Sequence, residues 1–143
     1  MTSGSVLRRA MFRVEMWFWA RTLPLRCRKS RDFADIMKIA DAGADRRYRG
    51  LAPAYIAHRA KRAARRPWVM RDRRCLREGI LAYRFLTLAG IPAAMHFGVD
   101  RKSIGSARLS AHCWVVVDDK PLLNPPEPSM VTVFIEKNRA GSA

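Results

Sequence analysis

Three side chains of this 143-residue chain have the types and order that thiol-based chemistry requires: Cys75, His112 and Asn124. A thiol becomes a good nucleophile when a neighbouring base takes its proton, and that base needs a third group to orient it. Cys75 opens a predicted helix, where backbone N–H groups and the helix dipole favour the thiolate. The amide oxygen of Asn124 can accept a hydrogen bond from the ring N–H of His112. Together they predict a Cys-His-Asn triad.

The pairing of Asn124 with His112 depends on the turn between two predicted strands. A three-residue turn, Asp118 to Lys120, would place Asn124 opposite Trp114. Asn124 would then lie diagonal to His112 on the same sheet face, about 7–8 Å away at Cα and within side-chain reach. A slip of one residue would turn the Asn124 side chain to the other face.

The remaining cysteines and histidines have simpler interpretations. Cys113 faces away from His112 along the strand and is expected to pack in the core or at a sheet edge. His58 and His96 have no evident orienting partner, and we expect them to be structural or exposed. The cysteines and histidines lack the paired spacing of metal sites, and the glycines do not form a phosphate-binding loop. We therefore expect no metal and no cofactor.

The helix that carries Cys75 is predicted over residues 75–89. Its apolar residues recur at helical spacing, and Asp72 is a candidate N-cap. Gly90 and Pro92 form the stop signal, because glycine suits the position after a helix and proline cannot continue it.

Three further helices precede it, separated by polar segments. They are expected over residues 6–20, 32–42 and 53–66, with Leu23-Pro24-Leu25 ending the first, a polar loop at 43–50, and Pro67-Trp68 ending the third. The first helix has a wide apolar face with interleaved arginines, which favours packing in the core. An interfacial membrane helix and a docking face for a partner protein are the alternatives.

After Pro92 the apolar period changes from about 3.6 residues to 2, which indicates strands. The strands are expected over residues 93–99, 111–117, 122–124 and 130–135. Helices followed by antiparallel strands predict an α+β fold. We expect a single domain over residues 1–143, with a basic helical part at 1–66 and the catalytic helix plus antiparallel sheet at 67–143.

The charge is concentrated in the first half of the chain. The formal net charge is +16, with 20 Lys and Arg against 6 Asp and Glu over residues 1–74 and 8 against 6 over residues 75–143. Such a surface suits an acidic partner, whether nucleic acid, anionic lipid or peptide, although solvated arginine faces are the simpler explanation. No apolar run approaches the length of a membrane span, and no secretory signal is visible. We therefore expect no stable membrane insertion, a cytoplasmic location and reduced cysteines.

An ordered set of short motifs resembles a known family. Cys75-Leu76 opens a helix, Gly90-Ile91-Pro92-Ala93 follows it, a strand ends in Gly98-Val99, and Ala111-His112-Cys113-Trp114-Val115 begins the next strand. This set is similar to the transglutaminase-like leader peptidase of lasso-peptide biosynthesis, closely over residues 67–124 and weakly over the helical front. Two positions depart from the family pattern: Asn124 stands where an Asp is usual, and Cys113 replaces a common Ala.

The resemblance implies a papain- or transglutaminase-like fold with N-terminal helices packed on a C-terminal sheet. It implies a cysteine protease that removes the leader of a lasso-peptide precursor, with Cys75 as nucleophile, His112 as base and Asn124 as the third residue. It also implies three partners: the precursor peptide, a separate leader-binding protein and a lasso cyclase. Two alternatives stay open, a basic module that binds nucleic acid or a partner, and a catalytically idle member of the same fold.

Overall fold

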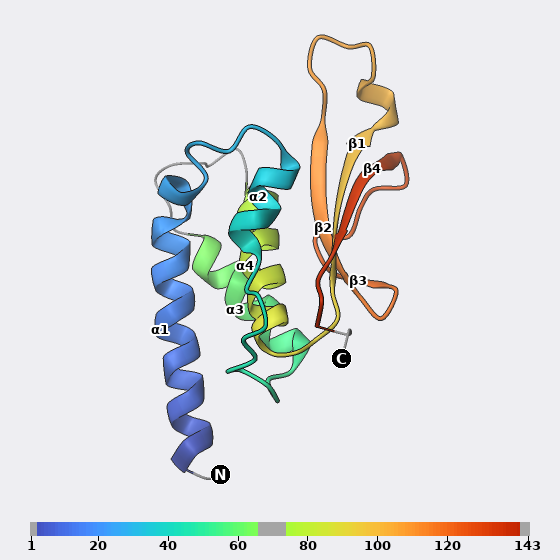
Figure 1. The fold of residues 1–143 in the computed structure, drawn as a ribbon. Coiled ribbons are helices and arrows are strands. Elements are labelled where there is room, and N and C mark those ends of the chain that lie inside the picture. Colours follow the sequence, from blue (N-terminus) through green and yellow to red (C-terminus); the bar gives the residue numbers. More distant parts are fainter. Residues whose placement is uncertain (1–2, 66–73, 141–143) are drawn as a thin grey trace.

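The computed structural model describes residues 3–65 and 74–140 of the chain, and its architecture is α+β (Figure 1). The helical layer lies against one face of the sheet, and α4 separates the sheet from α1 (Figure 1). The helices in the described part are α1 (Ser3–Arg26), α2 (Phe33–Ala40), α3 (Pro53–Ala64) and α4 (Arg74–Leu88), with a short 3-10 turn at Arg101–Ser103. The strands are β1 (Ala94–Asp100), β2 (Ala111–Val117), β3 (Lys120–Leu123) and β4 (Met130–Lys137).

Helix α4 is the central element of the fold. Twelve of its fifteen residues are buried, because α1, α2 and α3 pack around it on one side and the sheet covers the other. Its C-terminus closes as the stop signal predicts. Gly90 adopts a positive φ of 74°, its N–H donates to Thr87, and the N–H of Ile91 donates to Leu86 at 2.9 Å. This Schellman arrangement satisfies the last carbonyl groups and turns the chain into β1.

A glycine in α4 brings the helix close to the sheet. A Cβ atom at Gly79 would lie 2.7 Å from Cε of Met95 in β1 and 3.5 Å from Sγ of Cys113 in β2. A larger side chain would therefore have to displace the end of the Met95 side chain. The close approach brings the strand that carries His112 near the beginning of the helix that carries Cys75.

The sheet is antiparallel throughout, with the strand order β3-β2-β1-β4. The inward-facing residues of β1 and β2 include Met95, Cys113 and Val115, all of which are buried. Phe33 of α2 stacks on Phe97 with 4.2 Å between ring centroids, and this contact closes the helical layer over the sheet near the site.

The first helix differs from its predicted end. Pro24 does not terminate α1, which continues to Arg26. A proline in the last turn removes only one backbone hydrogen bond, and Leu23 is fully buried, so core packing outweighs that loss. The favoured core-packing face exists and contains Phe12, Met16 and Leu23. None of the helices in the described part combines the length and apolar character that a bilayer span needs.

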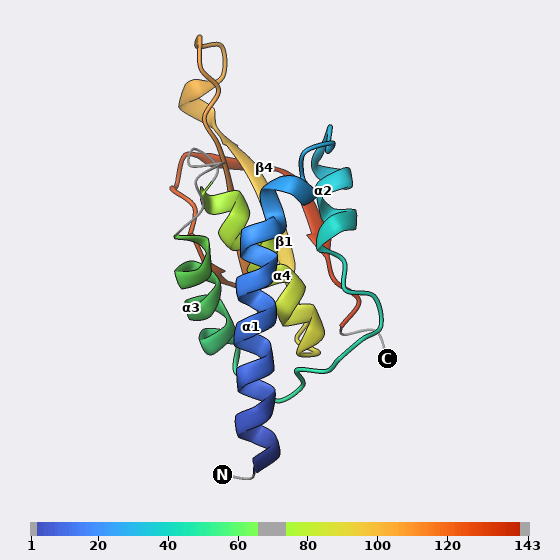
Figure 2. The ribbon, with the colours of Figure 1, turned by 90° about the vertical axis from the view of Figure 1, so that its left-hand side faces the viewer.

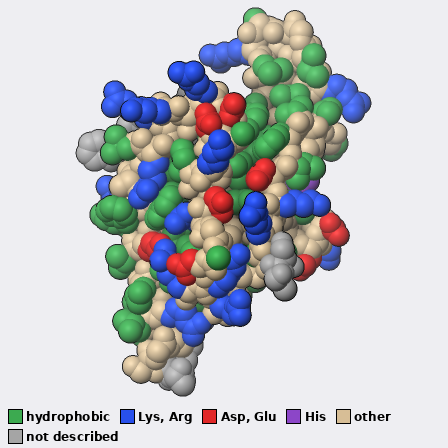
Figure 3. Space-filling view, in the orientation of Figure 1, with side chains coloured by type: hydrophobic (Ala, Val, Ile, Leu, Met, Phe, Trp, Pro, Cys, Tyr) green, Lys and Arg blue, Asp and Glu red, His purple; other side chains and the backbone are tan. Residues whose placement is uncertain are grey.

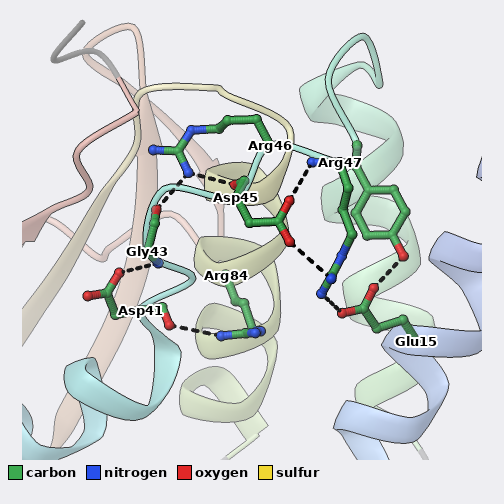
Figure 4. Close-up of polar contacts among 8 residues, drawn as sticks. Glu15, Asp41, Gly43, Asp45, Arg46, Arg47 and Arg84 are labelled. Carbon is green, nitrogen blue, oxygen red and sulfur yellow. Dashed lines mark hydrogen bonds and ion pairs between the residues drawn. The ribbon is translucent and has the colours of Figure 1, made fainter.

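The polar loop between α2 and α3 is anchored rather than free. Tyr48 is buried, its N–H donates to the carbonyl of Leu88 at 3.0 Å, and its hydroxyl donates to the carboxylate of Glu15. Arg47 also binds Glu15 (Figure 4). Burial and the Glu15 contact raise the pKa of the Tyr48 phenol. The loop thus ties α1 to the C-terminal end of α4.

The other end of the same loop is held by main-chain carbonyl groups. Arg84 of α4 donates to the carbonyl of Asp41 at 2.9 Å, and Arg46 donates to the carbonyl of Gly43 at 2.7 Å (Figure 4). Two arginines of the basic half, Arg46 and Arg47, and Arg84 of α4 therefore hold this loop in place.

The remaining boundaries agree with the predicted elements to within a few residues. The third helix ends at Ala64, β1 is Ala94–Asp100, and β4 extends to Lys137. The predicted N-cap Asp72 and the stop at Pro67-Trp68 lie outside the described residues.

Candidate active site

A groove of about 660 Å³ opens where the first turn of α4 meets the start of β2. Cys75, His112 and Cys113 line it on one side, and Phe33, Phe97 and Leu109 contribute apolar walls. Cys75 and His112 are half-buried, which leaves both accessible from the groove. The sulfur of Cys75 and the apolar walls therefore belong to the same groove.

Cys75 lies in the first turn of α4, as predicted. The thiolate is favoured here: the pKa of Cys75 is lowered from the ordinary 9.0 to about 5. The largest cause is a hydrogen bond from the Cys113 side chain, and burial opposes it. The backbone N–H of Cys113 and the nearby His112 lower the pKa further. The sulfur is therefore charged at neutral pH and faces an imidazole.

His112 connects the sulfur to the third predicted residue. Its Nε2 lies 3.0 Å from the backbone carbonyl oxygen of Asn124. A carbonyl oxygen can only accept, so Nε2 carries the proton of this hydrogen bond. Nδ1 is then the ring nitrogen available to Cys75, and the His112 side chain lies close enough to lower the pKa of that thiol. His112 therefore lies between Cys75 and Asn124.

The contact at Asn124 differs from the predicted one, because it uses the main chain. The amide oxygen was expected to orient the imidazole, but the carbonyl does so, and the amide Nδ2 is buried without a hydrogen-bond partner in the described part of the chain. Asn124 has a left-handed φ of 55°, directly after β3. This conformation turns its carbonyl toward His112, and asparagine tolerates it better than most residues do.

The predicted turn was wrong by one residue, and a bulge restores the register. The turn contains only Asp118 and Asp119, with φ of 53° and 62°, and Val117 pairs with Lys120. The pairing then shifts, so that Val115 pairs with Leu123 instead of Leu122. Continuing that register by one residue places Asn124 beside Trp114, where the longer turn would have placed it.

An aromatic platform supports the imidazole from the same sheet face. The rings of His112 and Trp114 are nearly parallel, with centroids 6.1 Å apart. Trp114 is buried and packs directly over Gly98, where a Cβ would lie 2.9 Å from its ring. His96 of β1 also contacts Trp114, with centroids 5.4 Å apart, which fits the structural role expected for it. His58 is exposed on α3.

Cys113 is the site residue whose role the sequence did not reveal. It is buried against α4, as its strand position predicts, yet its thiol and its backbone N–H both stabilise the sulfur of Cys75. Its hydrogen bond to Cys75 and its burial raise the pKa of Cys113, so it remains a protonated donor. In the sequence, the one feature that points to this role is its position next to His112. The alternation of side chains along the strand, however, places the two side chains on opposite faces of the sheet.

Charged residues in the first turns of α4 secure the helix that carries Cys75. Arg77 is buried and donates to the carbonyl of Ala64 at 2.9 Å, which joins α4 to the end of α3. Arg74 pairs with the buried carboxylate of Glu78 at 2.9 Å. No cluster of three His, Cys, Asp or Glu in the described ranges could hold a metal ion.

A thiolate at a helix N-terminus, set against a histidine that begins a strand of an antiparallel sheet, defines the papain- and transglutaminase-like class of folds. A family model described as the transglutaminase-like superfamily matches residues 17–135. The chain belongs to the transglutaminase-like superfamily, whose sites are typically of the cysteine-protease kind. No curated protein and no solved structure matches it.

Proposed function

We propose that this protein is a cysteine peptidase that removes the leader from a ribosomally made lasso-peptide precursor. The observation that carries the proposal is the geometry: Cys75 and His112 line one groove, and Nε2 of His112 lies 3.0 Å from the carbonyl oxygen of Asn124. The lowered pKa of Cys75 agrees with this arrangement. Superfamily membership supports the peptidase class. The narrower activity rests on the ordered motifs from Cys75 to Val115, which resemble the lasso leader peptidases.

The site can perform acyl transfer in two half-reactions. The Cys75 thiolate attacks the scissile carbonyl carbon, and the negative charge moves to the carbonyl oxygen. The backbone N–H of Cys75 at the helix N-terminus is the donor placed to stabilise that oxyanion. His112, protonated in the thiolate–imidazolium pair, gives its proton to the leaving amine as the C–N bond breaks.

Water completes the reaction. His112, now neutral, takes a proton from a water molecule, whose oxygen attacks the thioester carbon. The C–S bond breaks, the leader leaves with a free carboxylate, and the proton on His112 restores the ion pair with Cys75. The carbonyl of Asn124 holds the imidazole in one orientation during both half-reactions.

The proposed partners are the precursor peptide, a separate leader-binding protein and a lasso cyclase that closes the freed core peptide. Polar side chains line the groove beside Cys75 as well as apolar ones, among them Ser30, Arg31 and Asp32. The separate leader-binding protein would deliver the leader to this groove.

The decisive experiment replaces the nucleophile. Purified protein is incubated with the precursor and the leader-binding protein, and leader release is followed by mass spectrometry. Cys75→Ala should abolish release, because the other thiol that lines the groove, Cys113, is buried and burial raises its pKa. The matched control is Cys27→Ala, a half-buried cysteine away from the groove, which should cleave like the wild type. Unchanged cleavage by Cys75→Ala would rule out the mechanism.

A further inference from the structure

A second groove, of about 680 Å³, lies between α1 and α3 on the side of the helical layer turned away from the sheet (Figure 2). It is separate from the groove at Cys75, and the two share no lining residue. The chemistry proposed for Cys75 makes no use of it.

Five guanidinium groups line this groove. They belong to two neighbouring helices and the cap that follows α3: Arg13, Arg21, Arg59, Arg62 and Arg65. Within the described part of the chain, none of the five forms an ion pair, and no acidic residue lines the groove. Like charges gathered without counter-charge repel one another, so an anionic partner in the groove would relieve that repulsion.

The groove also carries exposed apolar side chains. Val14 is 68% exposed and Trp17 is 57% exposed, and the guanidinium of Arg21 lies 5.0 Å from the centre of the Trp17 ring. A tryptophan beside an arginine is a common combination at the centre of protein interfaces. The groove thus offers an apolar floor as well as a charge.

The exposed face of α1 has the spacing of a helix-packing surface. Five of its seven exposed large apolar residues recur at intervals of four, three, four and seven, along one stripe that Val14 shares with the groove: Leu7, Met11, Val14, Phe18 and Leu25. This heptad-like period matches the seam along which a second helix packs. Apolar side chains appear along the α1 edge of the surface in Figure 3.

We propose that the α1–α3 groove binds an acidic amphipathic helix of a partner protein, with its apolar stripe on Val14 and Trp17 and its carboxylates on the arginines. A second copy of this chain is disfavoured, because it would bring a second set of arginines to the same place. A nucleic acid would use the arginines but leave the apolar side chains of the groove, Val14 and Trp17, exposed. The inference does not depend on peptidase activity.

The probe is a fluorescein-labelled synthetic peptide of about three heptads, with leucine at a and d and glutamate at e and g. Its binding to the full chain is measured by fluorescence anisotropy. The acidic peptide should bind at least about tenfold more tightly than a matched peptide with lysine at e and g, and added salt should weaken the complex. Equal affinity for the two peptides would overturn the proposal.

Two pairs of substitutions test the apolar and the charged contributions separately. Val14→Ser with Trp17→Ser, and Arg59→Ser with Arg62→Ser, should each weaken peptide binding by about tenfold or more. The matched controls are Val133→Ser, 56% exposed on β4, and Arg108→Ser, exposed beyond β1, and both should bind normally. Wild-type binding by both groove variants would place the peptide elsewhere and contradict the proposal.

Further measurements test other possible occupants of the groove and whether its binding depends on peptidase activity. A dimer in light scattering that Val14→Ser with Trp17→Ser dissociates would identify a second copy instead. Binding of duplex DNA or phosphatidylglycerol vesicles that outcompetes the acidic peptide, and that the same variants abolish, would also overturn the peptide assignment. Cys75→Ala should bind the acidic peptide like the wild type, so a failed peptidase assay leaves this result intact.

Discussion

At the scale of single residues, the site depends on a main-chain carbonyl held in a left-handed conformation. Asn124→Gly keeps the carbonyl and the positive φ of 55° while it deletes the amide. We expect this variant to retain kcat for leader removal to within about threefold. Asn124→Ala should lower the free energy of unfolding by about 1 kcal/mol, because alanine is strained in this region.

The measurements are kcat, urea unfolding and the pH dependence of Cys75 alkylation in both variants. If the amide side chain were the orienting group, glycine and alanine would reduce kcat equally. A shift in the alkylation midpoint would report a misplaced imidazole, which a purely structural defect would not produce.

The thiolate of Cys75 gives a direct pH prediction. Its pKa in the fold is about 5, below the ordinary 9.0, so the fold favours the deprotonated form. Iodoacetamide should alkylate Cys75 at a rate that rises with pH to half its maximum near pH 5, as followed by mass spectrometry. The associated stabilisation is complete above the ordinary thiol pKa and is lost as the pH falls through about 5. A midpoint near 9 would contradict the thiolate.

Residue types predicted two groups of the site, the side chains of Cys75 and His112, and missed three. Cys75 and His112 could be found because helix and strand periodicity place their side chains. The carbonyl of Asn124 and the N–H of Cys113 could not, because every residue has these groups and only the backbone path decides where they point. The role of the Cys113 thiol was not predicted either. The alternation of side chains along a strand shows which face Cys113 occupies, but not how closely α4 approaches that face.

At the scale of elements, the support of His112 rests on close packing between β1 and β2. Gly98→Ala would place a Cβ 2.9 Å from the Trp114 ring and 2.9 Å from the carbonyl oxygen of Val131. Neither can move freely, so we expect a loss of about 1–3 kcal/mol in unfolding free energy, measured with urea. The control Gly4→Ala meets no atom within 4 Å and should be neutral or slightly stabilising. Equal stability of both variants would show that Trp114 yields easily.

Element types were predictable, and their exact ends were less so. The change of period after Pro92 separated helices from strands correctly, because the two structures expose side chains at different intervals. The prediction that Pro24 ends the first helix was wrong, because a proline costs little when less than one turn follows it. The burial of Leu23 stabilises this last turn. Local sequence carries no record of such tertiary contacts.

At the scale of the whole molecule, one phenylalanine joins most of the helical layer. Phe12 is fully buried, and its ring lies 5.3 Å from Tyr48, 5.6 Å from Tyr55 and 5.2 Å from Phe85, measured between centroids. Phe12→Ala should cost about 3–5 kcal/mol of unfolding free energy. Phe18→Ala, on the same helix but 53% exposed, should change it by less than about 0.5 kcal/mol. Similar losses in both variants would contradict the described orientation of α1.

The overall arrangement followed from the order of the elements, whereas the use of α1 did not. Its sequence is apolar on two sides, and only the packed structure shows that one side meets α4 while the other faces solvent. Composition could not separate these sides, since both have similar residues.

The short turn and the bulge between β2 and β3 have a consequence for comparing related chains. A three-residue turn without a bulge and the observed two-residue turn with a bulge both place Asn124 opposite Trp114. The carbonyl of Asn124 therefore occupies the same place in either arrangement. Relatives can therefore exchange one for the other without disturbing His112. Six residues separate Val117 from Asn124 in either arrangement. A sequence alignment therefore needs no gap here, and two chains aligned at the third residue can still differ in turn length and strand pairing.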